Sequence, residues 1–567
     1  MARTPLMEFV LRALHTTRGA AARKMPVVEY SEALREQRSR FSRRRFLQLT
    51  AGTAGAAALS SCPSPEERDV VIVGGGIAGL HCAYRLRRLG VVARIYDASS
   101  RVGGRIFTLR DYFPEGQSCE LGGELIDTGH LTMHDLAEEL GIELFDYDQD
   151  DRSLARLVAS FDGRLLSVDK ILQGLAPIAE KIDAALATMT DAEVVPTYRN
   201  PNGAEHLDQL SIRGWLDAQN IPGDDPVRQL IEVAYTGEFG LETDVSNALN
   251  LLTYISTSTL QLELFGDSDE RFRAKAGNDT FIQRLTERLD PAQFHLDQRL
   301  VRLEELSDGR YALTFEGAGG LREVKASHVV LALPFTLLRQ VELHVPLPEP
   351  KRRAIAELGY GTNAKLMVGF SSRPWRTQHG SDGSTYTDTG YMQTWETSRF
   401  QPGASGILTN FTGGHRGLAV GQGTAEQQAS NFLEELNRVF PGVSQAYNGK
   451  VARMHWPTYP LTQGSYSAYK VGQYTTLAGA EIERVRNLHF CGEHTSLDAQ
   501  GFMEGGALTG ALVATELAEE LALPAELRVG PAGRIISRAR VVRRQGRWLD
   551  GMRQHMPRRL RTVGARR

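Results

Sequence analysis

Apolar and polar positions follow two different periods between about residues 69 and 522. The run 69–73 is apolar and β-branched after its first residue, which is typical of a buried parallel strand. Segment 80–89 carries apolar residues at helical spacing and ends at Gly90, and segment 91–96 predicts a second strand. A strand, a helix and a strand in this order predict a βαβ unit in a parallel sheet.

The pattern changes twice further along the chain. Between 131 and 265 it is mostly helical, as in 133–140, which Gly141 closes. Between 346 and 478 strand-like runs appear, such as 365–370. The sequence therefore predicts an α/β chain, α+β overall, in which a parallel-sheet domain is combined with a region of mixed sheet and helices.

A glycine-rich turn lies between the first predicted strand and helix. Gly74 suits a tight turn, Gly76 lets backbone N–H groups approach a pyrophosphate, and Gly79 allows a helix to pack closely on a strand. Asp97 ends the second strand and can accept hydrogen bonds from a ribose diol. This pattern predicts dinucleotide binding by Gly74, Gly76, Ile77, Ala78, Gly79, Asp97 and Ala98.

A second glycine loop follows at once. Arg101-Val102-Gly103-Gly104-Arg105 offers close backbone approaches flanked by cations, which suits a long anionic cofactor that extends past the first βαβ unit. A flavoprotein fed by a nicotinamide would need a second dinucleotide fingerprint. The segment 317–320 lacks the third glycine and the helix, and is predicted to be a hairpin turn.

Both loops, together with a motif near the C-terminal end, resemble the flavin-containing amine oxidase family, which includes monoamine, polyamine and L-amino acid oxidases. The C-terminal motif is 489–495 followed by 501–510, and 331–334 matches a further family strand end. The resemblance implies a Rossmann-like FAD-binding domain that is interleaved with a substrate domain. It implies FAD contacts from Arg101, Gly104, Arg105, Gly122, Gly123, Glu124, Val301, Gly492, Glu493, Phe502 and Met503.

The motif spacing predicts how the domains alternate along the chain. Cofactor-binding parts are expected at 69–130, 269–345 and 479–523. A helical substrate-domain part is expected at 131–268 and a sheet part at 346–478. Residues 1–68 are expected to be a signal and linker, and 524–567 a disordered basic tail.

By the same resemblance, the chemistry is hydride transfer from an amine α-carbon to flavin N5. Tyr466 and Phe502 match an aromatic pair that faces the flavin, and Trp456 matches a packing tryptophan. Lys365 interrupts an apolar run and matches a lysine that is linked through water to N5. Ser465 stands where monoamine oxidases carry a flavin-bonded cysteine, so FAD is expected to be non-covalent.

The substrate class is less clear from the sequence. Leu125 stands where L-amino acid oxidases carry a carboxylate-binding arginine, while Glu124 and Asp127 would favour a cationic amine or a basic side chain. Asp127 and Tyr466 are the predicted substrate contacts, and capping of the following helix is the alternative role for the two acids. L-amino acid oxidation and a non-catalytic flavin-binding envelope protein are the alternative functions. Oxygen or a quinone is the expected electron acceptor.

Composition and the two ends of the chain bear on the partners and the cellular location of the protein. With 65 Lys+Arg against 68 Asp+Glu, the net charge of −3 argues against nucleic acid as a partner. Four scattered cysteines predict neither a disulfide scaffold nor a metal site. Segment 42–59 resembles a twin-arginine export signal, and its partner would be the export machinery. We therefore expect a periplasmic, secreted or anchored protein, with Cys62 as a lipidation candidate. Residues 528–567 of the tail, of formal charge +12, are either a membrane-surface contact or a solvated segment with no role.

Overall fold

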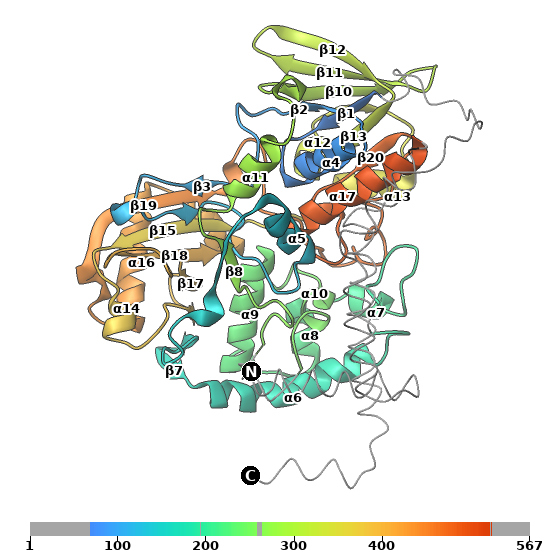
Figure 1. Cartoon of the computed structure of the whole chain (residues 1–567). Coiled ribbons are helices and arrows are strands. Elements are labelled where there is room, and N and C mark those ends of the chain that lie inside the picture. The colour runs from blue at the N-terminus through green and yellow to red at the C-terminus, as the bar shows by residue number, and fades with distance from the viewer. Residues whose placement is uncertain (1–68, 193, 258–262, 522, 524–567) are drawn as a thin grey trace, which may run out of the picture. The chain divides into compact units, whose positions relative to one another are not determined.

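The sheet that carries the glycine loops has five parallel strands in the order β20–β13–β1–β2–β9. The computed structural model describes residues 69–192, 194–257, 263–521 and 523 (Figure 1). The strands of this sheet are β1 (Val70–Val73), β2 (Arg94–Tyr96), β9 (Phe294–His295), β13 (His328–Leu331) and β20 (Leu488–Phe490). Strands from the first, middle and last thirds of the chain therefore meet in one sheet, as the interleaved domains require.

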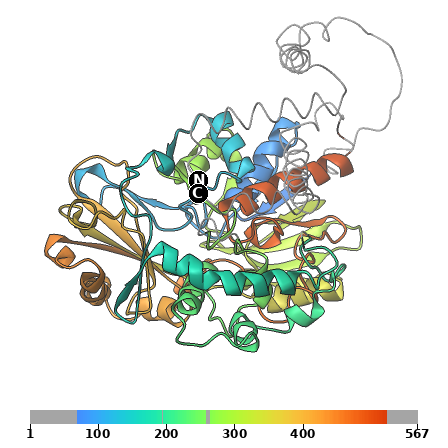
Figure 2. The ribbon, with the colours of Figure 1, turned by 90° about the horizontal axis from the view of Figure 1, so that it is seen from below.

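Successive side chains of β1 point to opposite faces of this sheet and are buried in two different cores. Val70 and Ile72 join a core formed with α4 (Ile77–Arg88), α5 (Leu131–Leu140), α11 (Asp279–Thr286) and α17 (Met503–Glu520). Helix α17 lies alongside α4 (Figure 2). The two helices approach so closely that a Cβ atom built on Gly510 would lie 2.2 Å from the Ala78 carbonyl oxygen. The predicted helix and its parallel strands are confirmed.

The opposite face of β1 packs against a second sheet. Val71 and Val73 share a core with Leu303 and Leu313 of a four-stranded sheet in the order β12–β11–β10–β14. Its strands are β10 (Arg299–Glu305), β11 (Tyr311–Gly317), β12 (Gly320–Ala326) and β14 (Glu342–His344). Strands β11 and β12 pair from Gly317 and Gly320 onwards, so the predicted hairpin turn is confirmed.

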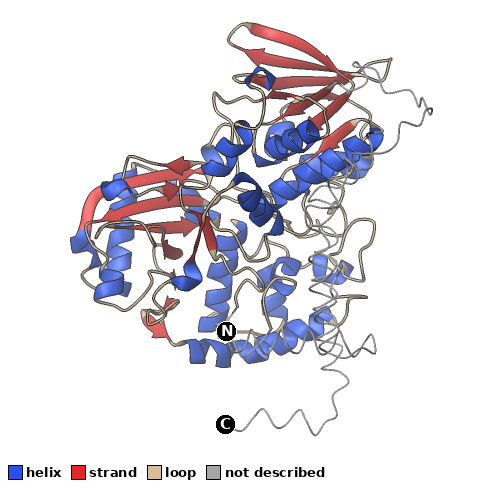
Figure 3. Cartoon of the chain, in the orientation of Figure 1, coloured by secondary structure: helices blue, strands red, loops and turns tan. Residues whose placement is uncertain are grey.

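The third sheet has seven strands in the order β19–β15–β18–β17–β16–β6–β7 (Figure 3). Its strands are β6 (Val158–Phe161), β7 (Arg164–Leu166), β15 (Ala364–Phe370), β16 (Thr385–Thr387), β17 (Gln393–Glu396), β18 (Gly406–Thr412) and β19 (Tyr447–His455). Leu366 and Val368 of β15 pack against α16 (Ala425–Val439). Successive side chains point to opposite faces, so Lys365 and Met367 lie on the other face, and Met367 packs with Trp456 there.

Helices build the third layer, beside the seven-stranded sheet. They are α6 (Val168–Leu186), α7 (Glu205–Asp208), α8 (Ile212–Ala218), α9 (Pro226–Phe239) and α10 (Ala248–Leu252). Short helices α12 (Phe335–Leu338), α13 (Glu349–Glu357), α14 (Pro374–Thr377) and α15 (Gly414–Val420) and the strand pairs β3 (Thr108–Leu109) with β4 (Cys119–Glu120) and β5 (Leu144–Asp146) with β8 (Phe272–Ala274) complete the fold.

The segment predicted to be helical, 131–268, differs in two ways from that expectation. Its strands β6 and β7 join the seven-stranded sheet through the parallel pairing of β6 with β16, and Ala159 and Phe161 are buried in the core that includes α6 and α9. Helix α5 buries Met133 and Leu136 in the core with α4 and α17, on the cofactor side of the fold.

The two ends of the chain lie outside the described residues. The export signal, Cys62 and the basic tail are therefore still predictions. Among the helices that the structure describes, none combines the length and apolar character needed to span a bilayer.

Candidate active site

The first glycine loop has the shape that a bound phosphate requires. Gly74 has φ +111°, and a Cβ atom there would lie 2.4 Å from the Ala332 carbonyl oxygen. A Cβ atom on Gly79 would lie 2.0 Å from the Gly74 carbonyl oxygen, so helix α4 needs glycine here to reach the strand. A Cβ atom on Gly76 would meet no atom within 4 Å. Gly76 therefore borders open space at the start of α4, where the helix dipole favours an anion.

Asp97 lies beside this loop at the end of β2. Its carboxylate accepts hydrogen bonds from the backbone N–H groups of Gly75 and Ser99, both at 2.7 Å. Burial raises the pKa of Asp97 despite these two bonds. The carboxyl group is thus fixed next to the glycine turn, as recognition of a ribose diol requires.

The second glycine loop is hydrogen-bonded to the first. The N–H of Gly103 donates to the Gly75 carbonyl at 2.8 Å. Arg101 donates to the Gly104 carbonyl at 2.8 Å, and its guanidinium lies 4.0 Å from the centre of the Phe107 ring. The predicted cofactor loops therefore form one continuous surface.

Arg105 connects this surface to the C-terminal motif. Its guanidinium donates to the Glu493 carboxylate and to the Ser465 carbonyl, each at 2.8 Å. Glu493 also accepts hydrogen bonds from the Ser467 hydroxyl at 2.7 Å and from the Gly501 N–H at 2.9 Å. Burial alone would raise the pKa of Glu493, but Arg105 and the other neighbours hold it below its ordinary value.

Residues expected to border the flavin also come together. A Cβ atom on Gly122 would lie 1.8 Å from the Arg105 carbonyl oxygen and 3.0 Å from the Trp456 ring. A Cβ atom on Gly123 would lie 2.7 Å from the side chain of Met503, the first residue of α17. The indole N–H of Trp456 donates to the Leu121 carbonyl at 3.1 Å. Gly122 and Gly123 thus allow three distant segments to meet.

Val301 is the predicted adenine contact in β10. The pairing of β10 with β11 shifts register between Leu300 and Arg302, which marks a bulge at Val301. The extra residue of a bulge lies outside the ladder. The main-chain groups of Val301 are therefore available for the predicted backbone contact with adenine.

Lys365 and Glu124 form a buried ion pair. The Lys365 ammonium donates to the Glu124 carboxylate at 2.7 Å, and the two residues are 4% and 5% exposed. Burial alone would raise the pKa of Glu124, but Lys365 and Arg273 hold it below its ordinary value. Glu124 was expected to favour a cationic substrate, and in the structure Lys365 compensates its charge.

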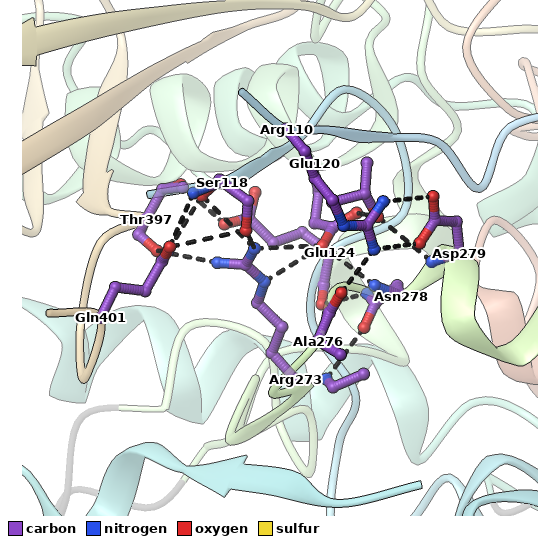
Figure 4. A network of polar contacts seen from close by, with 12 residues as sticks. Arg110, Ser118, Glu120, Glu124, Arg273, Ala276, Asn278, Asp279, Thr397 and Gln401 are labelled. Carbon is purple, nitrogen blue, oxygen red and sulfur yellow. Dashed lines mark hydrogen bonds and ion pairs between the residues drawn. The ribbon is translucent and has the colours of Figure 1, made fainter. Parts of the chain in front are cut away.

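A second buried ion pair supports the same loop (Figure 4). Arg273 lies 3.1 Å from the Glu120 carboxylate and donates to the Thr397 carbonyl at 2.9 Å. Asn278 donates its backbone N–H to Glu120 at 3.0 Å. Segment 118–124 is therefore held from β8, from the turn before α11 and from the seven-stranded sheet.

The predicted aromatic pair, Tyr466 and Phe502, lies in adjoining loops. The Tyr466 hydroxyl donates to the Glu238 carbonyl, and a Cβ atom on Gly501 would lie 3.2 Å from its ring. Phe502 precedes α17, and its ring centre lies 5.0 Å from that of His130. Burial and the negative charge of Glu238 raise the pKa of Tyr466, so its hydroxyl stays protonated.

Asp127 does not cap the following helix. Its carboxylate accepts from the Glu270 N–H at 2.9 Å and lies 3.3 Å from His130. The N-terminus of α5 is instead capped by Glu504, which accepts from the N–H groups of Thr132 at 3.0 Å and Met133 at 2.9 Å. The capping alternative for Asp127 is therefore wrong.

Two further acids, which the sequence reasoning missed, interact electrostatically with Asp127. Burial, with repulsion from Glu270 and Asp127, raises the pKa of Glu238 to about 8. The Glu270 side chain is exposed, and partial desolvation together with repulsion from Asp127 raises its pKa to about 7. Glu270 also has φ +46°, a strained value for a side chain of this kind. Asp127 thus acts on the charge of both glutamates, and Glu270 acts on that of Glu238, so we treat the three carboxyl groups as one acidic cluster.

Ser465 carries a hydroxyl group in place of the thiol that would bond to the flavin. Its hydroxyl donates to the Asn363 side chain at 2.6 Å. The described cysteines, Cys82, Cys119 and Cys491, are all buried, and burial raises the pKa of each thiol.

Three features together are those of an FAD-dependent oxidoreductase. They are the glycine loops that can approach a pyrophosphate, the Asp97 carboxylate that can bind a ribose, and the C-terminal motif that Arg105 joins to these loops. The chain belongs to the flavin-containing amine oxidoreductase family, whose model matches residues 77–518. Among curated relatives, it is 23% identical to an L-amino-acid oxidase of Siganus canaliculatus (82% of this chain, 88% of the relative). It is 23% identical to human amine oxidase B (79% and 86%) and 24% to a nicotine dehydrogenase of Pseudomonas putida (85% and 98%).

Solved structures show the same fold. Putrescine oxidase with bound putrescine and cyclohexylamine oxidase from Brevibacterium oxydans each match with a TM-score of 0.68 over 80% of this chain and 99% of theirs. The sequence identities are 20% and 22%. The family and fold predicted from the sequence are confirmed, and FAD is the cofactor.

Proposed function

We propose that the chain oxidises a cationic amine and that Asp127, Glu238 and Glu270 recognise its positive charge. The observation that carries this proposal is the acidic cluster beside Tyr466, the aromatic residue expected to face the flavin. A cluster of carboxyl groups that repel one another is stabilised when a cation binds between them. The same cluster opposes a substrate whose carboxylate would point toward it.

The residues of the site divide the reaction between them. FAD, when bound, accepts two electrons and a hydrogen from the carbon next to nitrogen. The acidic cluster binds the ammonium form and takes up one proton, which leaves the amine neutral. Tyr466 and Phe502 exclude water and orient the amine. The imine then adds water and releases a carbonyl compound with ammonia or a smaller amine, and oxygen or a quinone takes the two electrons.

The test is anaerobic bleaching of the flavin in stopped flow. The panel contains α,ω-diamines, monoamines of the same chain length and L-amino acids. We expect diamines to reduce the flavin at the lowest concentrations, and Asp127→Asn to raise the concentration for half-maximal rate by roughly ten-fold or more for diamines. Glu180→Gln, at an exposed acid of α6, is the matched control. A flavin that no amine reduces would exclude the proposal.

One observation favours an amino acid as the second candidate. Arg399 is buried and lies 4.2 Å from the centre of the Tyr147 ring, and its positive charge opposes the rise in the pKa of Glu270. An arginine beside the acidic cluster would bind the carboxylate of a basic amino acid whose side chain meets the acids. Rapid reduction by L-arginine or L-lysine, lost in Arg399→Gln, would establish this candidate in place of the first.

We also propose export by the twin-arginine route, because segment 42–59 carries the arginine pair and a short apolar run. Fractionation of cells that express the chain with Arg43→Lys and Arg44→Lys tests this. Retention of the double variant in the cytoplasm, with the parent outside it, supports export. Equal distribution of both would contradict it.

A further inference from the structure

Every N–H of the Lys365 ammonium has an acceptor within the protein. The ammonium has three hydrogens, and it donates to the Glu124 carboxylate at 2.7 Å, the Gly122 carbonyl at 2.8 Å and the Glu120 carbonyl at 3.2 Å. The alternation of β15 turns Lys365 away from α16 and toward this loop. Segment 120–124 thus supplies all three acceptors and fixes the position of the ammonium.

Both carboxylate oxygens of Glu124 also accept hydrogen bonds. One carboxylate oxygen accepts from Lys365 and the other from the Thr397 hydroxyl at 2.7 Å. The neighbouring pair, Arg273 and Glu120, contributes one further charge of each sign. This buried group of four side chains therefore has no net charge.

The group adjoins the residues that are expected to border the flavin. Gly122, whose carbonyl holds Lys365, is in contact with the Arg105 backbone and the Trp456 ring, and Gly123 is in contact with Met503. A charge that is buried at this place acts on the flavin through protein rather than through water, so its field is only weakly screened.

We propose that Glu124 is a positioning residue that fixes Lys365 and cancels its charge, so that the flavin is bordered by a neutral ion pair rather than by a free cation. The inference goes beyond the proposed function, because it concerns the bound flavin with any substrate. It assigns Glu124 to the control of flavin reduction rather than to contact with the amine.

The proposal predicts opposite effects from the two halves of the pair. Reduction by two electrons adds negative charge to the flavin, so a net positive neighbour favours the reduced form. Glu124→Gln leaves the Lys365 cation uncompensated and should shift the midpoint potential to more positive values. Lys365→Met leaves the Glu124 anion uncompensated and should shift it to more negative values. A double variant should return close to the parent, because both charges are absent.

The experiment measures the midpoint potential of the purified holoenzyme against a reference dye, with an enzymatic reductant and no amine. The parent, Glu124→Gln, Lys365→Met, the double variant and the control Glu180→Gln are compared at several pH values. A buried uncompensated cation is relieved by loss of its proton, so the positive shift in Glu124→Gln should disappear as the pH rises. Lys365→Arg, which keeps the charge, should remain near the parent.

Shifts of opposite sign, with recovery in the double variant, support the proposal. Unchanged potentials, or shifts of the same sign in both single variants, overturn it. If neither single variant retains FAD, retention by the double variant supports charge compensation, and failure of the double variant overturns it. Because no amine is present, the outcome is independent of the bleaching assay, and failure of either idea is recognised separately.

Discussion

Gly76→Ala should separate cofactor binding from folding. Gly76 precedes α4 with φ −73° and ψ 179°, which alanine adopts without strain. Its added methyl group would meet no protein atom within 4 Å. The apoprotein should therefore keep its stability or gain up to roughly 1 kcal/mol, because alanine lowers the entropy of the unfolded chain.

The same methyl group enters the space where the pyrophosphate is expected. Overpacking of a fitted contact costs about 1–3 kcal/mol, and each 1.4 kcal/mol is about ten-fold in affinity. We therefore expect the dissociation constant for FAD to rise by roughly 5- to 150-fold. Gly79→Ala is the matched comparison, since its Cβ atom would lie 2.0 Å from the Gly74 carbonyl oxygen and should destabilise the apoprotein itself.

The assay is titration of each apoprotein with FAD, followed by flavin fluorescence, together with thermal unfolding of the same apoproteins. The expected pattern is weak FAD binding with a normal melting temperature for Gly76→Ala, and a lowered melting temperature for Gly79→Ala. Parent-like FAD affinity in Gly76→Ala would refute the placement of the phosphate at this loop.

Two further predictions concern buried charge. Arg273→Met leaves Glu120 buried without its partner. The free energy of unfolding of the holoenzyme, measured in urea, should fall by about 3–5 kcal/mol. A fall of less than about 1 kcal/mol would show that the pair is not essential to the loop. Glu238 has a pKa of about 8 in the fold against an ordinary 4.5, so the folded apoprotein retains a proton that the unfolded chain releases. Its free energy of unfolding should therefore fall as the pH rises from about 4.5 to about 8, and Glu238→Gln should flatten this slope; an unchanged slope would mean that Glu238 does not carry the shift.

The cofactor loops were predictable because their chemistry is local. The requirements at Gly74 and Gly79 come from backbone atoms within a few residues or on the adjoining strand. The place of Lys365 follows from a two-residue period, since Leu366 and Val368 must face α16. Such patterns are written in short stretches of sequence, which is why they identify the family.

The acidic cluster was not predictable by the same means. Glu238 lies near the end of α9, in an ordinary amphipathic pattern, and Glu270 lies in a polar turn before β8. Neither position differs from a solvated acid until the tertiary fold brings both to Asp127. Likewise, Glu124 reads as a free charge in the sequence because its partner lies 241 residues further on.

The two groups of acids have different consequences for a bound cation. Glu124 and Glu120 each have a buried basic partner, Lys365 and Arg273, so they hold the loop in place and contribute no net attraction. Asp127, Glu238 and Glu270 repel one another, and a substrate ammonium group relieves that repulsion when it binds. Under the two proposals, specificity for a cation belongs to the acids that repel one another, and control of the flavin belongs to the acid whose charge Lys365 cancels.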